Sequence, residues 1–246
     1  MSLERVVQIQ AQETKVRDDL TVVELGTLDY HSALDMQEKL VVLRNQNKIT
    51  DTVLLLEHPH VYTLGKDVKE EELGALVKGE LPAEIIQVQR GGKITYHGPG
   101  QLVAYFICRM PFDKYTAFLT QVEDVGIATL KSLGIDAYSR KHDVDPRSNK
   151  RGIKGAWYKV EGVDRKVVAQ GVEVRESSRQ ANERMVVTLH GFAMNVNTDL
   201  AFFQKIHPCG FQYDVMTSMK EILGREVDMN QVKEVVKEQL REKLKW

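Results

Sequence analysis

The residues whose types best suggest chemistry lie in one glycine-rich run, Arg90 to Gln101, which holds four glycines and one proline. It leads directly into the apolar run 102–107. Glycine allows the backbone to adopt positive φ or to approach a ligand closely. Such a run is therefore either a ligand cradle walled by backbone amides or a hairpin turn between two strands. Because a simple turn needs none of Arg90, Tyr96 and His97, the sequence favours the cradle.

Cys209 is the candidate nucleophile. It lies in a His-Pro-Cys-Gly run, whose turn-forming residues make a poor place to bury a thiol. Cys108 instead ends an apolar run and is expected to be a small buried hydrophobe. A free thiol has a pKa of about 8.5, so a nearby cation is needed to raise its thiolate fraction at neutral pH. The candidate cations are Lys166, His190, His97 and His207.

Lys166 is distinguished only by its position. A lone lysine is most often a solvated surface residue. This one opens a predicted strand that ends in the small, glycine-containing sequence Ala169, Gln170, Gly171. The sequence therefore predicts a second wall of a site after Lys166.

Other chemistries lack their motifs in this chain. The phosphate-binding Gly-x-x-x-x-Gly-Lys-Ser/Thr run is missing, and no Gly-x-Gly-x-x-Gly opens a βαβ unit. Neither His-Glu-x-x-His nor paired Cys-x-x-Cys is available for a metal. A Gly-x-Ser-x-Gly nucleophile elbow is also missing. Covalent thiol chemistry without a cofactor or a metal is the simplest remaining option.

Composition is that of a soluble globular protein. The 246 residues are 42% hydrophobic and 28% charged, with a net charge of −1, so nothing pulls the whole chain towards nucleic acid or a membrane. No apolar run approaches the roughly 18 residues of a spanning helix. The first twenty residues lack the apolar core of a secretory signal, and their acidic residues argue against a transit peptide. With two cysteines only, a cytoplasmic location is expected.

The length allows one large domain or two small ones, and the hydrophobic pattern predicts the α/β (α+β) class, with one mixed β-sheet flanked by helices. Strands are predicted over Leu20–Leu25, Thr52–Glu57, Val61–Leu64, Ile85–Gln89, Leu102–Cys108, Ala156–Val160, Lys166–Val174 and Met185–Leu189. Helices are predicted from about Tyr30 to Gln46, Asp67 to Lys78 and Tyr115 to Leu133, and at the C-terminus around Val232, Val236, Leu240 and Leu244. The basic segment Ser139–Lys154 is either a solvated loop or a docking patch for an acidic partner.

Four motifs together resemble the octanoyl-[acyl-carrier-protein]:protein N-octanoyltransferase family of lipoate biosynthesis. They are Arg90–Gln101 followed by Tyr105, then Lys166–Gly171, His190–Asn197 and Ile206–Gly210. The resemblance implies a single α/β domain, 1–246, with a fold like that of biotin protein ligases and lipoate-protein ligases. It also implies transfer of an octanoyl group, first from octanoyl-acyl carrier protein to a cysteine thioester, then to one lysine of a lipoyl domain.

Carried onto this chain, the resemblance makes Cys209 the acyl acceptor and Lys166 the residue that lowers its pKa. The expected acceptors are the lipoyl domains of 2-oxo-acid dehydrogenase complexes and the glycine cleavage H protein. No cofactor and no metal are implied. The residues expected to bind substrate are Arg90, Gly91, Gly92, Lys93, Ile94, Thr95, Tyr96, His97, Ala169, Gln170, Gly171, Gly191, Phe192 and Ala193.

Several points stay open at this level. Either Lys166 or His97 could deprotonate the acceptor lysine. The polar hairpin Glu176–Arg184 is longer than the family leads one to expect, and Gln170 stands where an apolar residue is more usual. The alternatives are a lipoate-protein ligase, which would need ATP, an octanoyl amidotransferase, and a non-catalytic module that binds an acyl carrier.

Overall fold

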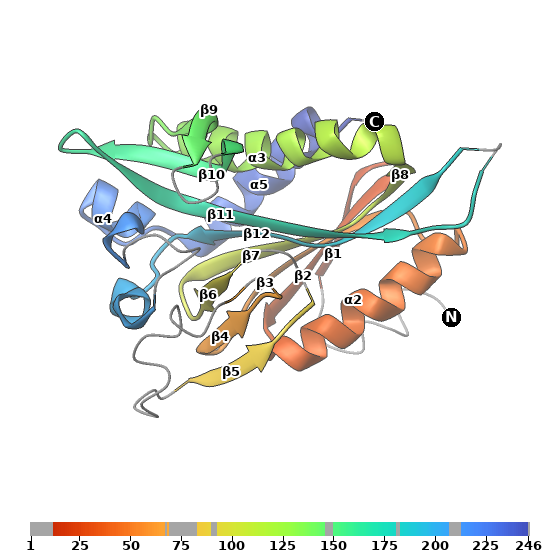
Figure 1. Cartoon of the computed structure of the whole chain (residues 1–246), viewed down its shortest axis with the longest axis horizontal. Coiled ribbons are helices and arrows are strands. Elements are labelled where there is room, and N and C mark those ends of the chain that lie inside the picture. The colour runs from red at the N-terminus through yellow and green to blue at the C-terminus, as the bar shows by residue number, and fades with distance from the viewer. Residues whose placement is uncertain are drawn as a thin grey trace.

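The computed structural model describes residues 12–66, 68, 83–89, 93–145, 150–180, 183–206 and 213–245. In these residues a mixed sheet of nine strands forms the centre of the protein (Figure 1). Its strands are β1 (Gln12–Arg17), β2 (Leu20–Thr27), β3 (Asp51–Glu57), β7 (Gln101–Ile107), β8 (Arg109–Pro111), β9 (Tyr138–Asp145), β10 (Lys150–Val160), β11 (Val163–Glu176) and β12 (Met185–Asn195). The order is β1-β2-β3-β7-β12-β11-β10-β9, with β8 paired to β12, and among these pairs β2 and β3 alone run parallel.

A three-stranded sheet lies beside the large one (Figure 1). Its central strand β4 (Val61–Leu64) pairs in parallel with β5 (Glu84–Gln87) and antiparallel with β6 (Ile94–His97). The glycine-rich run thus connects two sheets, because β5 and β6 belong to the small sheet and β7 to the large one. The sequence analysis predicted one sheet and did not separate β6 from the glycine loop.

Helices cover both faces of the large sheet (Figure 1). Helix α2 (Tyr30–Asn45) packs on one face, and α3 (Tyr115–Ser132) and α5 (Met229–Lys243) pack on the other. The short helix α4 (Met219–Leu223) precedes α5, and a 3-10 helix spans Leu200–Lys205. No helix in the described part of the chain has the length and apolar character needed to cross a membrane.

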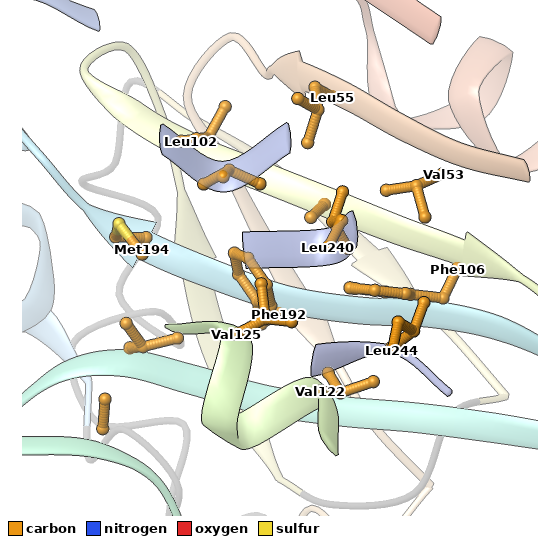
Figure 2. Packing of buried hydrophobic residues seen from close by; sticks show 14 of the residues in the cluster. Val53, Leu55, Leu102, Phe106, Val122, Val125, Phe192, Met194, Leu240 and Leu244 are labelled. Atoms are coloured by element: carbon orange, nitrogen blue, oxygen red, sulfur yellow. The ribbon is translucent and has the colours of Figure 1, made fainter. Parts of the chain in front are cut away.

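The alternation of side chains along β7 divides the core into two clusters. Leu102 and Phe106 point into the cluster under α3 and α5, where Val122 and Leu240 meet them (Figure 2). Val103, Tyr105 and Ile107 point to the opposite face, which α2 covers. Because β7 is buried on both faces, its sequence is a continuous apolar run rather than an alternating one.

The predicted mixed sheet flanked by helices is confirmed, and so are the predicted strands and three of the helices, with ends shifted by a few residues at most places. The largest shifts extend β10, β11 and β12 beyond their predicted ends. The predicted helix over Asp67–Lys78 lies outside the described residues, apart from Val68.

The interpretation of 139–154 as a solvated loop is wrong, since most of the segment forms β9 and part of β10. Its charged side chains suit β9 because this strand lies at the end of the sheet order, where charges discourage pairing with another chain. Two shifts of register between β9 and β10 accompany glycines with positive φ at Gly152 and Gly155. The docking interpretation stays a prediction.

Candidate active site

A pocket lies on the α2 side of the large sheet, next to β6. Its volume is about 480 Å³ including the open mouth. Most of its walls are small or aromatic side chains from β6, β7, β11 and β12. The lining residues are Tyr30, Thr95, His97, Val103, Tyr105, Ala169, Gln170, Gly171, His190, Gly191, Phe192 and Ala193.

Eight of the residues expected to bind substrate line this pocket: Thr95, His97, Ala169, Gln170, Gly171, Gly191, Phe192 and Ala193. Ile94 and Tyr96 are turned away from it. They alternate with Thr95 and His97 along β6, so they face a buried cluster with Tyr62 and Phe203 instead.

Several predicted residues cannot be placed in this site. Arg90, Gly91, Gly92 and Cys209 lie outside the described residues, as does His207. Lys93 leads into β6, where its carbonyl oxygen accepts a hydrogen bond of 3.3 Å from the amide of Gly65.

His97 is oriented by a buried chain of amide side chains. The amide nitrogen of Gln101 donates to the carbonyl oxygen of Tyr96 at 3.2 Å and to Oδ1 of Asn195 at 2.9 Å. Gln101 therefore presents its Oε1 to Nδ1 of His97, at 2.7 Å. Since an amide oxygen can only accept, His97 carries a proton on Nδ1, and in the neutral ring Nε2 bears the lone pair.

The same chain of hydrogen bonds reaches the strand that carries Lys166. Nδ2 of Asn195 donates to the carbonyl oxygen of Thr217 at 3.0 Å, and the amide of Thr217 donates to the carbonyl oxygen of Lys166 at 3.0 Å. Asn195 and Thr217 are almost completely buried. The polar network thus runs from the ring of His97 to the backbone of Lys166, the other residue predicted as a base.

Lys166 is itself buried, with 4% of its surface exposed. Its ammonium nitrogen lies 4.7 Å from the centre of the Trp157 ring, in the range of a cation–π interaction. Trp157 is fully buried on β10 and pairs with Lys166 in the sheet register. A lysine of this kind is far from the solvated surface residue that a lone lysine usually is.

The backbone beside Lys166 requires glycine. Gly155 has φ +111°, and a Cβ there would lie 2.2 Å from the carbonyl oxygen of Val168 and 3.6 Å from Cδ of Lys166. Its amide donates to Oε1 of Glu123 at 3.2 Å. Burial raises the pKa of Glu123, which is only 3% exposed within α3. Glu123 thus fixes the backbone of β10 at Gly155, the residue that packs beside Lys166.

His58 anchors Tyr105 from behind the pocket. Nδ1 of His58 lies 2.6 Å from the carbonyl oxygen of Leu28, which can only accept, so Nδ1 is the donor. Nε2, at 2.7 Å from the Tyr105 hydroxyl, then accepts from it. Burial lowers the pKa of His58 to about 4, so the ring is neutral at neutral pH. Sequence analysis missed His58, although it directly follows the buried strand β3.

His190 closes one end of the pocket in a strained conformation. Its φ is +58°, and its amide donates to Oε1 of Gln37 at 2.8 Å. Its Nε2 lies 3.5 Å from Oε2 of Glu173, a carboxyl whose pKa falls to about 2 because it bonds to His190 and Arg175. Of the candidate cations for Cys209, His190 therefore has a carboxylate partner.

Two further residues shape the pocket through their backbone. A Cβ at Gly191 would lie 2.0 Å from the carbonyl oxygen of Ala104, so only glycine allows β12 to approach β7 so closely. The Gln170 side chain turns away from the pocket, since its amide donates to the carbonyl oxygen of Leu119 in α3 at 2.9 Å. Gln170 therefore lines the pocket with its backbone and not with its polar side chain.

Cys108 is buried in the core under α3 and α5. Burial raises the pKa of its thiol well above the ordinary range. A thiol with so small a thiolate fraction is a poor nucleophile. This agrees with the expectation that Cys108 is structural.

These features define a domain built on a mixed sheet, with a small-walled pocket and a buried lysine on β11, one of the strands that form its wall. Residues 29–241 match the lipoyl protein ligase A/B catalytic domain, which is most of the chain. The chain therefore belongs to the family of lipoyl protein ligase A/B catalytic domains.

Its relatives carry the name octanoyltransferase. That of Salinispora arenicola is 37% identical over 230 residues, which cover 92% of this chain and 97% of the relative. That of Desulforamulus reducens is 38% identical over 219 residues, which cover 87% and 86% of the two chains. The resemblance inferred from the four motifs is confirmed.

Among solved structures, a bi-partite lipoate protein ligase of Thermoplasma acidophilum has a similar fold, with a TM-score of 0.61. The alignment covers 91% of this chain and 82% of that chain at 14% identity, so it shows the fold alone. The expected lipoate-protein ligase fold is confirmed.

Proposed function

We propose that this chain is an acyltransferase that moves an octanoyl group from octanoyl-acyl carrier protein to a lysine of a lipoyl domain, through a thioester on Cys209. The observation that carries the proposal is the pocket lined by Tyr105 and by residues 169–171 of the strand that also holds Lys166, because its walls suit a saturated chain. The names of the curated relatives support the octanoyl group as cargo.

In the first step the Cys209 thiolate attacks the thioester carbonyl of the donor. A carbon–sulfur bond to Cys209 forms, and the carrier leaves as its thiolate, which takes up a proton. One thioester replaces another, so the step is close to neutral in energy. Backbone amides around the reacting carbonyl would hold the developing oxyanion, where one donor is typically worth about 10²–10³ in rate.

In the second step the neutral amine of the acceptor lysine attacks the acyl-cysteine, so a carbon–nitrogen bond forms, the carbon–sulfur bond to Cys209 breaks and Cys209 leaves as its thiolate. The lysine pKa of about 10.4 leaves roughly one amine in a few thousand neutral at pH 7, so a base must take its proton. Lys166 and His97 are the candidates: the network orients the His97 ring, and Lys166 is buried beside Trp157. The amide formed is more stable than the thioester consumed, so the reaction needs no ATP.

The proposed acceptors are the lipoyl domains of 2-oxo-acid dehydrogenase complexes and the glycine cleavage H protein. The ligase of similar fold from Thermoplasma acidophilum is described together with its E2 lipoyl domain, which supports a lipoyl domain as the acceptor here.

The experiment that tests the proposal is intact-protein mass spectrometry after the chain is mixed with octanoyl-acyl carrier protein, without ATP. We expect a gain of one octanoyl group that hydroxylamine removes. Cys209→Ala should abolish this gain, whereas Cys108→Ala should keep it. An adduct that persists in Cys209→Ala would refute the assignment of the nucleophile.

The same assay separates the alternatives. Modification of a lipoyl domain only with ATP and free octanoate would identify a lipoate-protein ligase. Loading from an octanoylated carrier domain in preference to the acyl carrier protein would identify an amidotransferase. Binding of the acyl carrier protein without any adduct would identify a non-catalytic module.

A further inference from the structure

We infer that Tyr105, held by His58, and His190 form an end wall that limits the length of the acyl chain. The inference rests on the proposed octanoyl transfer and assigns the specificity of the same pocket. It follows from the register of three strands, from the anchoring of two aromatic rings and from the small side chains between them and Lys166.

The register of β7, β12 and β11 gives the pocket a direction. Ala169, Ala193 and Val103 form the row of the pocket nearer to Lys166. Gly171, Gly191 and Tyr105 form a row two residues further along the strands. Lys166 and Gly171 are five residues apart on β11, which corresponds to about 16 Å in a strand. An acyl group that reacts beside Lys166 therefore extends its methyl end towards Tyr105.

Two aromatic rings line the pocket in this direction. The walls that β11 and β12 give to the two rows are small, with alanine at Ala169 and Ala193 and glycine at Gly171 and Gly191. The rings of Tyr105 and His190 then meet edge to face, with centroids 5.9 Å apart. A saturated chain that passes the small walls meets these two rings.

The Tyr105 ring is fixed in position because its hydroxyl is hydrogen-bonded to His58. The bond from the hydroxyl to His58 is 2.7 Å long, and His58 is in turn fixed to the carbonyl oxygen of Leu28 at 2.6 Å. His58 is fully buried, and the ring of Tyr30 packs against it with centroids 5.2 Å apart. Close packing behind the ring leaves no room for it to move.

His190 is held at two points. Gln37 of α2 accepts its backbone N–H, and Glu173 of β11 lies 3.5 Å from its Nε2. Gln37 comes from the helix that covers this face and holds the His190 backbone, whereas Glu173 comes from the neighbouring strand and meets the ring. Rigid walls discriminate by about tenfold or more per methylene when an extra group has no space.

The experiment measures acyl-enzyme formation with hexanoyl-, octanoyl-, decanoyl- and dodecanoyl-acyl carrier protein, by intact mass. Wild type should load octanoyl best. Tyr105→Ala removes the wall and should raise the ratio of dodecanoyl to octanoyl loading at least tenfold. Tyr105→Phe keeps the ring but removes the hydroxyl that His58 holds, so its ratio should rise less than that of Tyr105→Ala.

A second variant, which should shift the preference towards shorter acyl chains, keeps the inference testable if Tyr105→Ala fails to fold. Ala193→Leu adds bulk in the row nearer to Lys166, so it should raise the ratio of hexanoyl to octanoyl at least tenfold. Ile107→Ala is the matched control, because Ile107 lies on the same face of β7 outside the pocket lining. It should leave both ratios unchanged.

The outcomes separate the two proposals. A wild-type protein that loads none of the four chains overturns the proposed function and the length limit with it. A wild type that loads octanoyl, together with unchanged ratios in a folded Tyr105→Ala or in Ala193→Leu, overturns the length limit alone.

Discussion

The ammonium nitrogen of Lys166 lies 4.7 Å from the centre of the Trp157 ring, and the guanidinium carbon of Arg140 lies 4.8 Å from the same centre. The indole therefore supports two cations at once, one of them the proposed catalytic lysine. Trp157 reaches this position because β10 pairs with β11 in a shifted register after Ala156. Its ring thus contacts the end of the Lys166 side chain.

Replacing Trp157 should impair acyl transfer through Lys166. A desolvated cation–π contact is worth about 1–2 kcal/mol, so Trp157→Leu should slow the transfer roughly tenfold. Trp157→Phe keeps an aromatic face and should lose less. The measurement is the rate of octanoyl transfer, with urea unfolding as a check of folding. A folded Trp157→Leu that transfers at the wild-type rate would remove Trp157 from this role.

His58 should make stability depend on pH. Its pKa is about 4 in the folded protein against about 6.5 when unfolded. The contribution of neutral His58 to the free energy of unfolding is therefore complete above pH 6.5 and is lost as the pH falls towards 4. The loss amounts to about 3 kcal/mol in total. Carboxylates titrate in the same range, so the measurement is the difference in unfolding free energy between wild type and His58→Gln.

That difference should shrink by about 2–3 kcal/mol between pH 7 and pH 4.5, because the variant has no imidazole to protonate. A difference that stays constant over this range would show that His58 is not held neutral by the fold.

Glu123 should matter for its acceptor oxygen rather than for its charge. Glu123→Ala leaves the amide of Gly155 and the Ser139 hydroxyl without this acceptor, at a cost of about 1–3 kcal/mol. Glu123→Gln keeps one. Burial raises the pKa of Glu123 in the folded protein, so protonation of Glu123 stabilises the fold. The free energy of unfolding of wild type should therefore increase relative to that of Glu123→Gln as the pH falls, and this increase should be lost as the pH rises through the folded pKa.

Urea unfolding of the three proteins at pH 5 and pH 8 measures both effects. Equal losses in Glu123→Ala and Glu123→Gln at pH 8 would contradict the assignment of Glu123 as a hydrogen-bond acceptor for Gly155.

Arg109 should hold the long hairpin between β11 and β12. Its buried guanidinium donates to Ser177, to the carbonyl oxygen of Ser178 and to Gln180, at 2.8–2.9 Å. Arg109→Gln should cost about 2–3 kcal/mol and open residues 176–184 to limited proteolysis. Arg184→Gln is the control, because its ion pair with Glu176 is exposed and contributes little. Equal protease resistance in all three proteins would refute the anchoring.

The sequence by itself determined the elements and the family. Apolar runs and helical spacing are local properties, so β3, β7, α2 and α3 could be predicted within a few residues. The glycine-rich run and the Lys166 segment identified the family because a motif is recognised from the order of its residue types, which requires no knowledge of contacts.

Only the tertiary structure decided which side chains meet. A strand can be predicted without knowing which face looks into a pocket, so Thr95 and His97 could not be separated from Ile94 and Tyr96. The contact of His58 with Tyr105 depends on the pairing of β3 with β7.

The link from His97 to Lys166 likewise passes through Asn195 and Thr217, which are far apart in sequence. Such contacts arise from strand pairing over long separations, which no local pattern encodes. For that reason the sequence could predict which residue types suggest chemistry, whereas the fold decided which of them line the pocket and which network orients His97.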